Sequence, residues 1–476
     1  MVVEQEQVAA RKQDRMRAVL DRDRQAVVVI HGIGDQRPMD TLRPFVDAVL
    51  GVDPKSESSA RYYSKPDEFS STFELRRLQS KDSRPRTDYF ELYWQHLVPT
   101  ATWRKIVAWL QLLLSRRPRD VPPPLRGLWF ASWVISMGVG CFLALSLVAW
   151  MFPAGPWIPD WINASVTKPL GMAAILAVLQ GLILSYVGDA ATYLSPNPEN
   201  IEARQAVREA GVELLEQLHG GNGKELVYDR IVIVGHSLGS VIGYDILTYA
   251  WSRFNDRHGS PPSPVNDEVH AAELLARSLW TSPSTAIRTE WLKSTRRLWL
   301  EQRQNRFAWR VTDFITLGSP LAHSLLLLAR NGTEFARKKE QRELPTSPPR
   351  LDGSTFAYTV KYTIENDALR SVYCLHHAAL FAVTRWTNLF FPVRMLLKGD
   401  LVGGAIAPAL GPGVLDIPVT TGTSGGWLAH TSYWRPGKGD RAVAASAINE
   451  LVKALDIGRH TFRDSEIKAA KPGETG

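Results

Sequence analysis

Residues 235–239, Gly-His-Ser-Leu-Gly, constrain the fold more than any other stretch of the sequence. An apolar run at 231–234 precedes them and a helix-like segment at 240–247 follows. In this setting the Gly-x-Ser-x-Gly pattern predicts a strained turn between strand and helix, which lifts the Ser237 side chain clear of a sheet. The two glycines fit because only small residues tolerate crowding against neighbouring backbone. The alternative is an ordinary strand-to-helix turn that contains a serine by chance.

Other segments place this turn in an α/β protein. The run at 25–30 is apolar and mostly β-branched after its first residue, which suits a strand buried on both faces of a parallel sheet. Further strands are expected at 87–94, 311–317, 356–363 and 386–391, and helices at 40–50, 199–218, 267–280, 285–305 and 440–455. Alternating strands and helices predict a mostly parallel sheet with helices on its faces.

Two uncharged runs interrupt the pattern, at 127–159 and 169–188. Helices over about 127–152 and over 169–188 would be long enough to cross a bilayer. Arginines before the first run place both flanks on the cytoplasmic side by the positive-inside rule. The sequence therefore predicts a membrane protein with a two-span transmembrane hairpin and a cytoplasmic catalytic domain. A buried helical hairpin or a large lid is the alternative interpretation.

These boundaries divide the chain into consecutive segments. They are an N-terminal polar helix or tail at 1–24, the first part of the α/β domain at 25–100, an interfacial helix with the hairpin at 101–190, the domain with the serine turn at 191–250, a helical cap insertion at 251–310, the rest of the domain at 311–457, and a flexible tail at 458–476.

Composition limits the partners of the chain. The 476 residues carry a net charge of +8 and include 16 tryptophans, both of which suit an anionic membrane surface, although a solvated basic surface explains the charge equally well. No basic stripe accompanies a nucleic-acid-binding motif, so nucleic acid is not expected. The two cysteines have neither disulfide-framework nor metal-site spacing, and no metal or cofactor is predicted. Nothing in the sequence indicates the oligomeric state.

A second glycine-rich turn follows the strand at 25–30. It begins with His31 and Gly32 and continues to residue 35. Backbone N–H groups after an early strand and directly after the serine are suited to hold a negatively charged oxygen. The expected donors are the N–H groups of Ile33 and Leu238, with Gly32 allowing close approach of the backbone. The alternative is an ordinary turn.

Together these motifs resemble those of the α/β-hydrolase superfamily, in its lipase and esterase branch. The resemblance rests on His31-Gly32, on Gly235, His236 and Gly239 around Ser237, on Thr316-Leu317-Gly318-Ser319-Pro320, and on a late His430. It covers about half the chain and leaves out the hairpin and the insertion. It implies hydrolysis of a lipid or acyl ester through an acyl-enzyme, without metal or cofactor. An acyltransferase or thioesterase, or a non-catalytic membrane scaffold, is the alternative.

In this family a serine of this kind is followed along the chain by an acid and then by a histidine. His430 is the expected base, because it lies in a glycine-rich stretch before the last predicted helix. His323 comes too early in the strand order, and His376 and His377 precede the strand at 386–391 and are expected to be helical.

The acid should follow the strand that precedes the histidine. Asp400, in a glycine-rich turn after the strand at 386–391, is the expected residue. Asp416 is the main alternative, and Glu365 and Asp367 are more distant ones. The expected site therefore has Ser237 as nucleophile, His430 as base and Asp400 as the group that orients the imidazole.

Overall fold

The computed structural model of the protein describes part of the chain, in separate ranges. The described residues are 24–32, 36–52, 61–98 without 71, 82 and 84, 117–118, 121, 129–130, 133, 137, 193, 198–220, 228–255, 267–304, 307–363, 369–393, 399–420 without 401, 429–435, 443 and 445–457. Of the predicted N-terminal segment at 1–24 only residue 24 belongs to this set, and it begins the first strand; the predicted tail at 458–476 lies outside the set, as does most of the predicted segment at 101–190.

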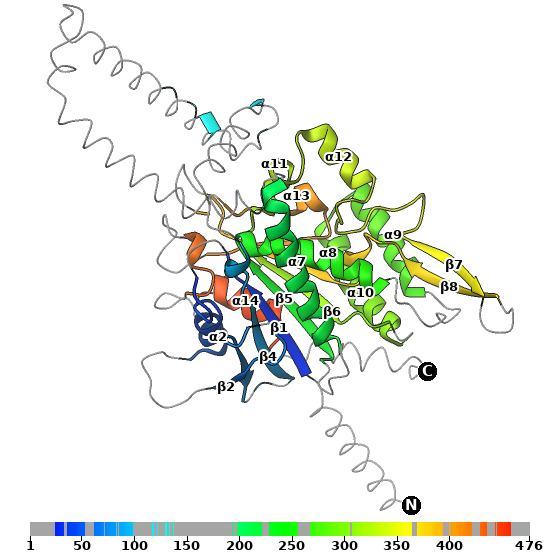
Figure 1. The fold of residues 1–476 in the computed structure, drawn as a ribbon. Helices are drawn as coiled ribbons and strands as arrows, with labels where there is room; N and C mark the ends of the chain where they lie inside the picture. Colours follow the sequence, from blue (N-terminus) through cyan, green and yellow to red (C-terminus); the bar gives the residue numbers. More distant parts are fainter. Residues whose placement is uncertain are drawn as a thin grey trace, which may run out of the picture.

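An eight-stranded sheet with the order β10-β9-β6-β5-β1-β4-β3-β2 forms the centre of the fold (Figure 1). Six strands run parallel: β1 (Arg24–Ile30), β4 (Arg86–Leu92), β5 (Arg230–His236), β6 (Val311–Leu317), β9 (Arg385–Phe390) and β10 (Leu415–Pro418). The strand β3 (Arg76–Ser80) pairs antiparallel with β4, and the edge strand β2 (Tyr62–Pro66) pairs antiparallel with β3. The predicted α/β class with a mostly parallel sheet is confirmed.

Helices cover both faces of the sheet, because its inner strands bury apolar side chains on both faces. Val27 and Val29 pack in one cluster with helices α2 (Leu42–Leu50) and α14 (Ala447–Leu455). Val28 and Ile30, which point to the other face, pack in a cluster with α7 (Pro198–Leu218), α8 (Leu238–Asn255), α9 (Asp267–Thr281) and α10 (Thr285–Gln304). The alternation of side chains along β1 thus produces three layers.

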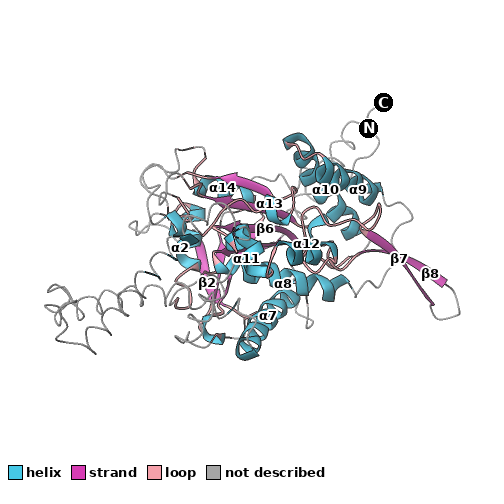
Figure 2. Ribbon diagram, turned by 90° about the horizontal axis from the view of Figure 1, so that it is seen from above, coloured by secondary structure: helices cyan, strands magenta, loops and turns pink. Residues whose placement is uncertain are grey.

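Shorter elements connect these layers. They are η1 (Gln95–Leu97), η4 (Pro320–His323), α11 (Ser324–Leu328), α12 (Gly332–Glu340), η5 (Leu380–Ala382), α13 (Ala407–Leu410) and η6 (Ala429–Thr431). Strands β7 (Ala357–Thr363) and β8 (Leu369–Leu375) form a separate antiparallel ribbon that projects from the body (Figures 1 and 2).

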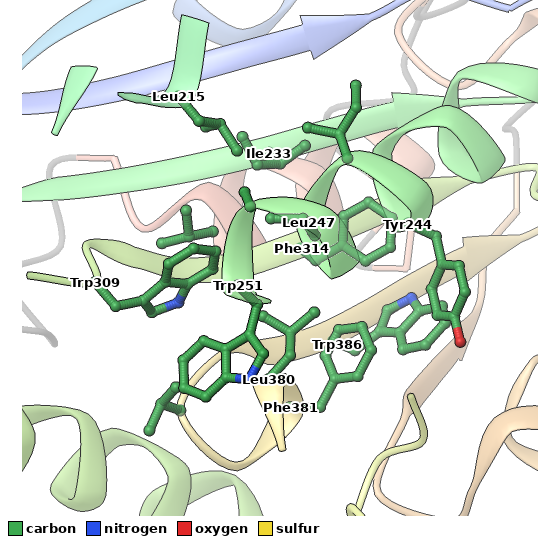
Figure 3. Close-up of a cluster of buried hydrophobic side chains, with 14 of the residues drawn as sticks. Leu215, Ile233, Tyr244, Leu247, Trp251, Trp309, Phe314, Leu380, Phe381 and Trp386 are labelled. Atoms are coloured by element: carbon green, nitrogen blue, oxygen red, sulfur yellow. The ribbon is translucent and has the colours of Figure 1, made fainter. Parts of the chain in front are cut away.

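Large aromatic side chains fill the layer between α8 and the sheet (Figure 3). The rings of Trp251 and Trp309 meet edge to face at 5.4 Å, and those of Phe314 and Trp386 lie 5.3 Å apart. The buried indole N–H groups of this layer have acceptors: that of Trp251 donates to the His376 carbonyl at 3.2 Å, that of Trp309 to the Thr384 hydroxyl at 3.0 Å and that of Trp386 to the Thr316 hydroxyl at 3.2 Å. Five fully buried tryptophans, Trp94, Trp251, Trp291, Trp309 and Trp386, show that part of the tryptophan content belongs to the core.

A buried ion cluster joins the insertion to the sheet near the start of β6. Asp313 pairs with Arg385 at 2.6 Å and with Arg230 at 2.7 Å, and Arg296 of α10 lies 3.8 Å away. Burial alone would raise the pKa of Asp313, but the three guanidinium groups hold it well below its ordinary value. The helices predicted in the insertion are therefore present and attached to the sheet, while their role as a cap stays a prediction.

The prediction of a multi-pass membrane protein with a cytoplasmic catalytic domain is contradicted. No helix among the described residues has the length and apolar character that crossing a bilayer requires. The two predicted spans, 127–152 and 169–188, lie almost entirely outside those residues. Length and lack of charge led to the prediction, but an uncharged run of this length also suits a helix buried in protein.

Four strands were not expected from the sequence. β2, β3, β8 and β10 all lie outside the strand ranges predicted above. β2 consists of Tyr-Tyr-Ser-Lys-Pro at the sheet edge and exposes three of its five side chains, so it lacks the apolar alternation that marks a strand. The pairing of β2 with β3 therefore accounts for its strand conformation, which its composition does not predict.

The aromatic layer makes a matched prediction about stability. Phe314→Ala removes a fully buried ring and should lower the free energy of unfolding by about 3–5 kcal/mol, because it leaves a cavity beside Trp386. Phe73→Ala makes the same chemical change at a fully exposed side chain and should stay within about 0.5 kcal/mol. Urea denaturation measures both, and equal effects would contradict the proposed core.

Candidate active site

The site lies where the strand order reverses. The next three strands along the chain, β2, β3 and β4, lie on one side of β1 in the sheet, whereas the later strands begin with β5 on its other side. The carboxyl ends of β1 and β5 are therefore neighbours. In open α/β sheets such a reversal leaves a crevice where ligands bind. His31 and Gly32 follow β1, and Ser237 follows β5. A Cβ added to Gly32 would lie 2.8 Å from the Ser237 Cβ, so the two turns are in contact.

The turn at Ser237 is strained. Its φ of +52° lies in the left-handed region, which non-glycine residues rarely adopt, and its N–H donates to the Leu317 carbonyl at 3.0 Å. A Cβ added to Gly239 would lie 2.2 Å from the Ile30 carbonyl oxygen. A Cβ added to Gly235 would lie 2.5 Å from the Ser240 Cα. Both glycines are therefore required by close backbone approach.

The three residues expected from the sequence form one hydrogen-bonded row. His430 Nε2 lies 2.9 Å from Ser237 Oγ, and His430 Nδ1 lies 2.9 Å and 3.0 Å from the two carboxylate oxygens of Asp400. A carboxylate only accepts, so Nδ1 carries a proton, and Nε2 of the neutral ring is free to accept the hydroxyl proton of Ser237. Asp400 is fully buried and His430 is 20% exposed, so the row opens to solvent at the imidazole.

Asp400 is held as a carboxylate by three donors in addition to His430. Oδ1 accepts the N–H groups of Val402 at 2.9 Å and Gly403 at 3.0 Å, and Oδ2 accepts the Tyr433 hydroxyl at 2.8 Å. Burial alone would raise the pKa of Asp400, but the hydrogen bond and charge of His430, with these donors, lower it to about 2. The acid beside the imidazole is therefore ionised at neutral pH.

Two members of this site were not identified from the sequence. Tyr433 is buried, and its hydroxyl accepts the Phe391 N–H at 3.2 Å while donating to Asp400. Gly318 has a φ of +56°, and a Cβ there would lie 2.6 Å from Asp400 Oδ2. Gly318 was noticed only as part of a turn, and no spacing in a sequence marks a tyrosine that hydrogen-bonds an acid across the fold.

The alternative acids lie elsewhere. Asp416 accepts the N–H groups of Ile406 at 2.9 Å and Ala407 at 2.8 Å and the side-chain amide of Asn388 at 2.7 Å, and burial raises its pKa. Asp416 thus fixes the start of α13, whereas Asp400 contacts the imidazole. Glu365 and Asp367 lie outside the described residues.

His376 is not helical, contrary to expectation, but follows strand β8. Its Nε2 donates to the Arg350 carbonyl at 3.0 Å, and its Nδ1 accepts the Ala378 N–H at 3.1 Å. Burial lowers its pKa to about 4, so this neutral histidine joins loops away from Ser237.

Of the two expected oxyanion donors, the structure describes the residue of one, Leu238. Leu238 begins α8 directly after Ser237, where helix N–H groups are unpaired within the helix. Ile33 lies outside the described residues. The preceding turn is held by Trp94, whose indole N–H donates to the His31 carbonyl at 3.0 Å and whose ring stacks on the His31 imidazole at 5.0 Å. Burial lowers the pKa of His31 to about 4, so this ring is neutral.

Comparison of the chain with family models, with curated proteins and with solved structures finds no match in any of the three. Within the described part of the chain, no group of three or more His, Cys, Asp or Glu side chains is placed to hold a metal ion. A functional interpretation therefore rests on the geometry around Ser237.

The low pKa of Asp400 predicts acid-dependent stability. Because the folded-state pKa of about 2 is below the ordinary value of 3.8, ionised Asp400 stabilises the fold fully above about pH 4 and loses this effect as the pH falls towards 2. The difference in unfolding free energy between the wild type and Asp400→Asn should shrink over that range by on the order of 2 kcal/mol.

Denaturant titrations at pH 5, 3.5 and 2.5 measure this difference. Glu343→Gln removes a half-exposed carboxylate and is the control, since a surface ion pair contributes little. A wild-type advantage over Asp400→Asn that stays constant from pH 5 to 2.5 would contradict the assignment.

Proposed function

We propose that the chain is a serine hydrolase of the α/β-hydrolase superfamily that cleaves acyl esters through an acyl-enzyme. The observation that carries the proposal is the row from Ser237 Oγ through His430 to Asp400, with heavy-atom distances of 2.9–3.0 Å. Such a row on a strained strand-to-helix turn is the arrangement that activates a serine hydroxyl. The mostly parallel sheet and the chain order serine, acid, histidine support the family.

The first half-reaction forms the acyl-enzyme. Ser237 Oγ attacks the carbonyl carbon of the ester while His430 Nε2 takes the hydroxyl proton. The imidazolium that results faces the Asp400 carboxylate, which stabilises its charge without taking the proton. The tetrahedral intermediate then loses its alcohol: the carbon–oxygen bond breaks, His430 donates the proton to the departing oxygen, and the acyl group stays on Ser237.

The second half-reaction reverses these roles with water. His430 Nε2 takes a proton from water as its oxygen attacks the acyl carbon, and the second tetrahedral intermediate expels Ser237. The imidazolium returns the proton to Ser237 Oγ, and the carboxylic acid leaves. In each half-reaction His430 Nε2 accepts one proton and then donates it, so the free enzyme is regenerated.

The negative oxygen of both intermediates needs N–H donors. We assign the N–H of Leu238 and, from the turn after Gly32, that of Ile33. The Leu238 N–H lies at the N-terminus of α8, where the helix dipole also favours negative charge. Each donor is expected to contribute about 3 kcal/mol to transition-state binding.

The substrate class is an acyl ester. The preference for lipids depended on the predicted transmembrane hairpin, and that argument is withdrawn with it. An acyltransferase or a thioesterase would use the same three residues, since only the acceptor or the leaving atom differs. Product analysis with and without an alcohol acceptor separates transfer from hydrolysis.

Covalent labelling tests the nucleophile. A fluorophosphonate should add once to the wild-type protein at Ser237, because phosphonylation needs an activated serine. Intact-protein mass spectrometry measures the addition. Ser237→Ala should not be labelled, and Ser278→Ala, which changes a partly exposed serine of α9 whose hydroxyl donates to the Leu274 carbonyl, should be labelled as fast as the wild type. An unlabelled wild type, or a labelled Ser237→Ala, would refute the proposal.

The choice of acid is tested by a matched pair of isosteric changes. Asp400→Asn should lower kcat roughly 10³- to 10⁴-fold, because the imidazole loses the group that fixes its tautomer and stabilises its charge. Asp416→Asn should lower thermal stability but leave kcat within about threefold, since Asp416 holds backbone N–H groups. Steady-state hydrolysis of a nitrophenyl ester measures both, and an equal loss in both variants would contradict the assignment.

A further inference from the structure

The residue before the nucleophile contacts the residue that carries the base. His236 ends strand β5, and its Nε2 lies 2.8 Å from the main-chain carbonyl oxygen of His430. The two residues are 194 positions apart in the chain. This contact joins the backbone of the base to the strand that bears Ser237, independently of the hydrogen bond between the reacting side chains.

The contact defines the tautomer of His236. A carbonyl oxygen only accepts, so the proton of the hydrogen bond is on Nε2. The other ring nitrogen, Nδ1, faces the turn after β1, where a Cβ on Gly32 would lie 3.1 Å from it. Burial, and then the neighbouring His430, lower the pKa of His236 to about 3, which keeps the ring neutral at physiological pH.

Aromatic packing fixes the direction of this donor. The indole of Trp434 meets the His236 ring edge to face at 4.7 Å, and the Tyr433 ring does so at 5.9 Å. The His430 ring lies 5.0 Å from the His236 ring. These neighbours belong to the same short segment, 429–435, as the base, so the segment encloses the imidazole to which it is hydrogen-bonded.

We propose that His236 is a positioning residue for the reaction: its Nε2–H holds the main chain of His430 so that the base stays within hydrogen-bond distance of Ser237. The inference rests on the proposed function. Asp400 fixes the base through its side chain, and His236 fixes it through its backbone, so together they leave the imidazole one orientation. A misplacement of about 1 Å at such a site costs roughly 100-fold in rate.

A pair of substitutions separates the hydrogen bond from the packing. His236→Gln keeps an N–H donor at about the reach of Nε2, whereas His236→Leu keeps apolar bulk without a donor. Because His236 acts through His430 rather than on the substrate, His236→Leu should lower kcat roughly 10- to 100-fold and leave KM within about twofold. His236→Gln should recover most of the lost kcat.

Hydrolysis of a nitrophenyl ester supplies kcat and KM, and thermal unfolding supplies stability. Unchanged kcat in His236→Leu, or an equal loss of kcat in the Gln and Leu variants at equal stability, would overturn the inference. Fluorophosphonate labelling of the wild type keeps the two proposals apart: without labelling at Ser237 the proposed function fails, whereas normal labelling with an insensitive His236 overturns only the positioning role.

A measurement on the unaltered protein covers the case in which His236→Leu does not fold. Long-range ¹H–¹⁵N correlation spectra report which imidazole nitrogen carries the proton, with His236→Gln used to assign the signal. The expected result is a neutral Nε2–H tautomer from pH 5 to 8. An Nδ1–H tautomer would leave no donor for the His430 carbonyl and would overturn the inference.

Discussion

Helix α8 begins so close to the end of β1 that residue 239 has no space for a side chain, since a Cβ there would lie 2.2 Å from the carbonyl oxygen of Ile30. This approach requires the chain to leave β5 through a sharp turn, and Ser237 takes the strain with a φ of +52°. The same turn directs the serine side chain away from the sheet. Backbone packing in the centre of the fold thus sets the position of the candidate nucleophile, and the surrounding groups are arranged around it.

Two buried aspartates lie at opposite ends of the parallel strands, and they are stabilised differently. Asp313, near the start of β6, is surrounded by guanidinium groups. Asp400, beyond the end of β9, is held by N–H and O–H donors and by one imidazole. Full charges lock the first carboxylate into a structural cluster. Dipoles keep the second ionised while leaving it able to respond to a charge that forms on His430.

The sequence predicted the elements whose signal is local. Apolar runs revealed β1 and β5, and the glycines around Ser237 marked the turn because close approach excludes larger residues. His430 and Asp400 were found because chain order limits the choices, and the structure brings both to Ser237. Tyr433, the donor role of His236 and edge strand β2 were missed because their roles depend on contacts between distant parts of the chain. The membrane spans were predicted from length and apolar character, and neither property identifies what surrounds a helix.

The row from Ser237 to His430 joins residues 193 positions apart, and β1 must pair with β5 across a similarly long stretch. Closing loops of this size costs chain entropy before any contact offsets it, so we expect such contacts to form late in folding. A partly folded chain can contain β5 and α8, which are adjacent along the chain, and still lack a base. Ester turnover by this protein would therefore report completed folding rather than the presence of the segment around Ser237.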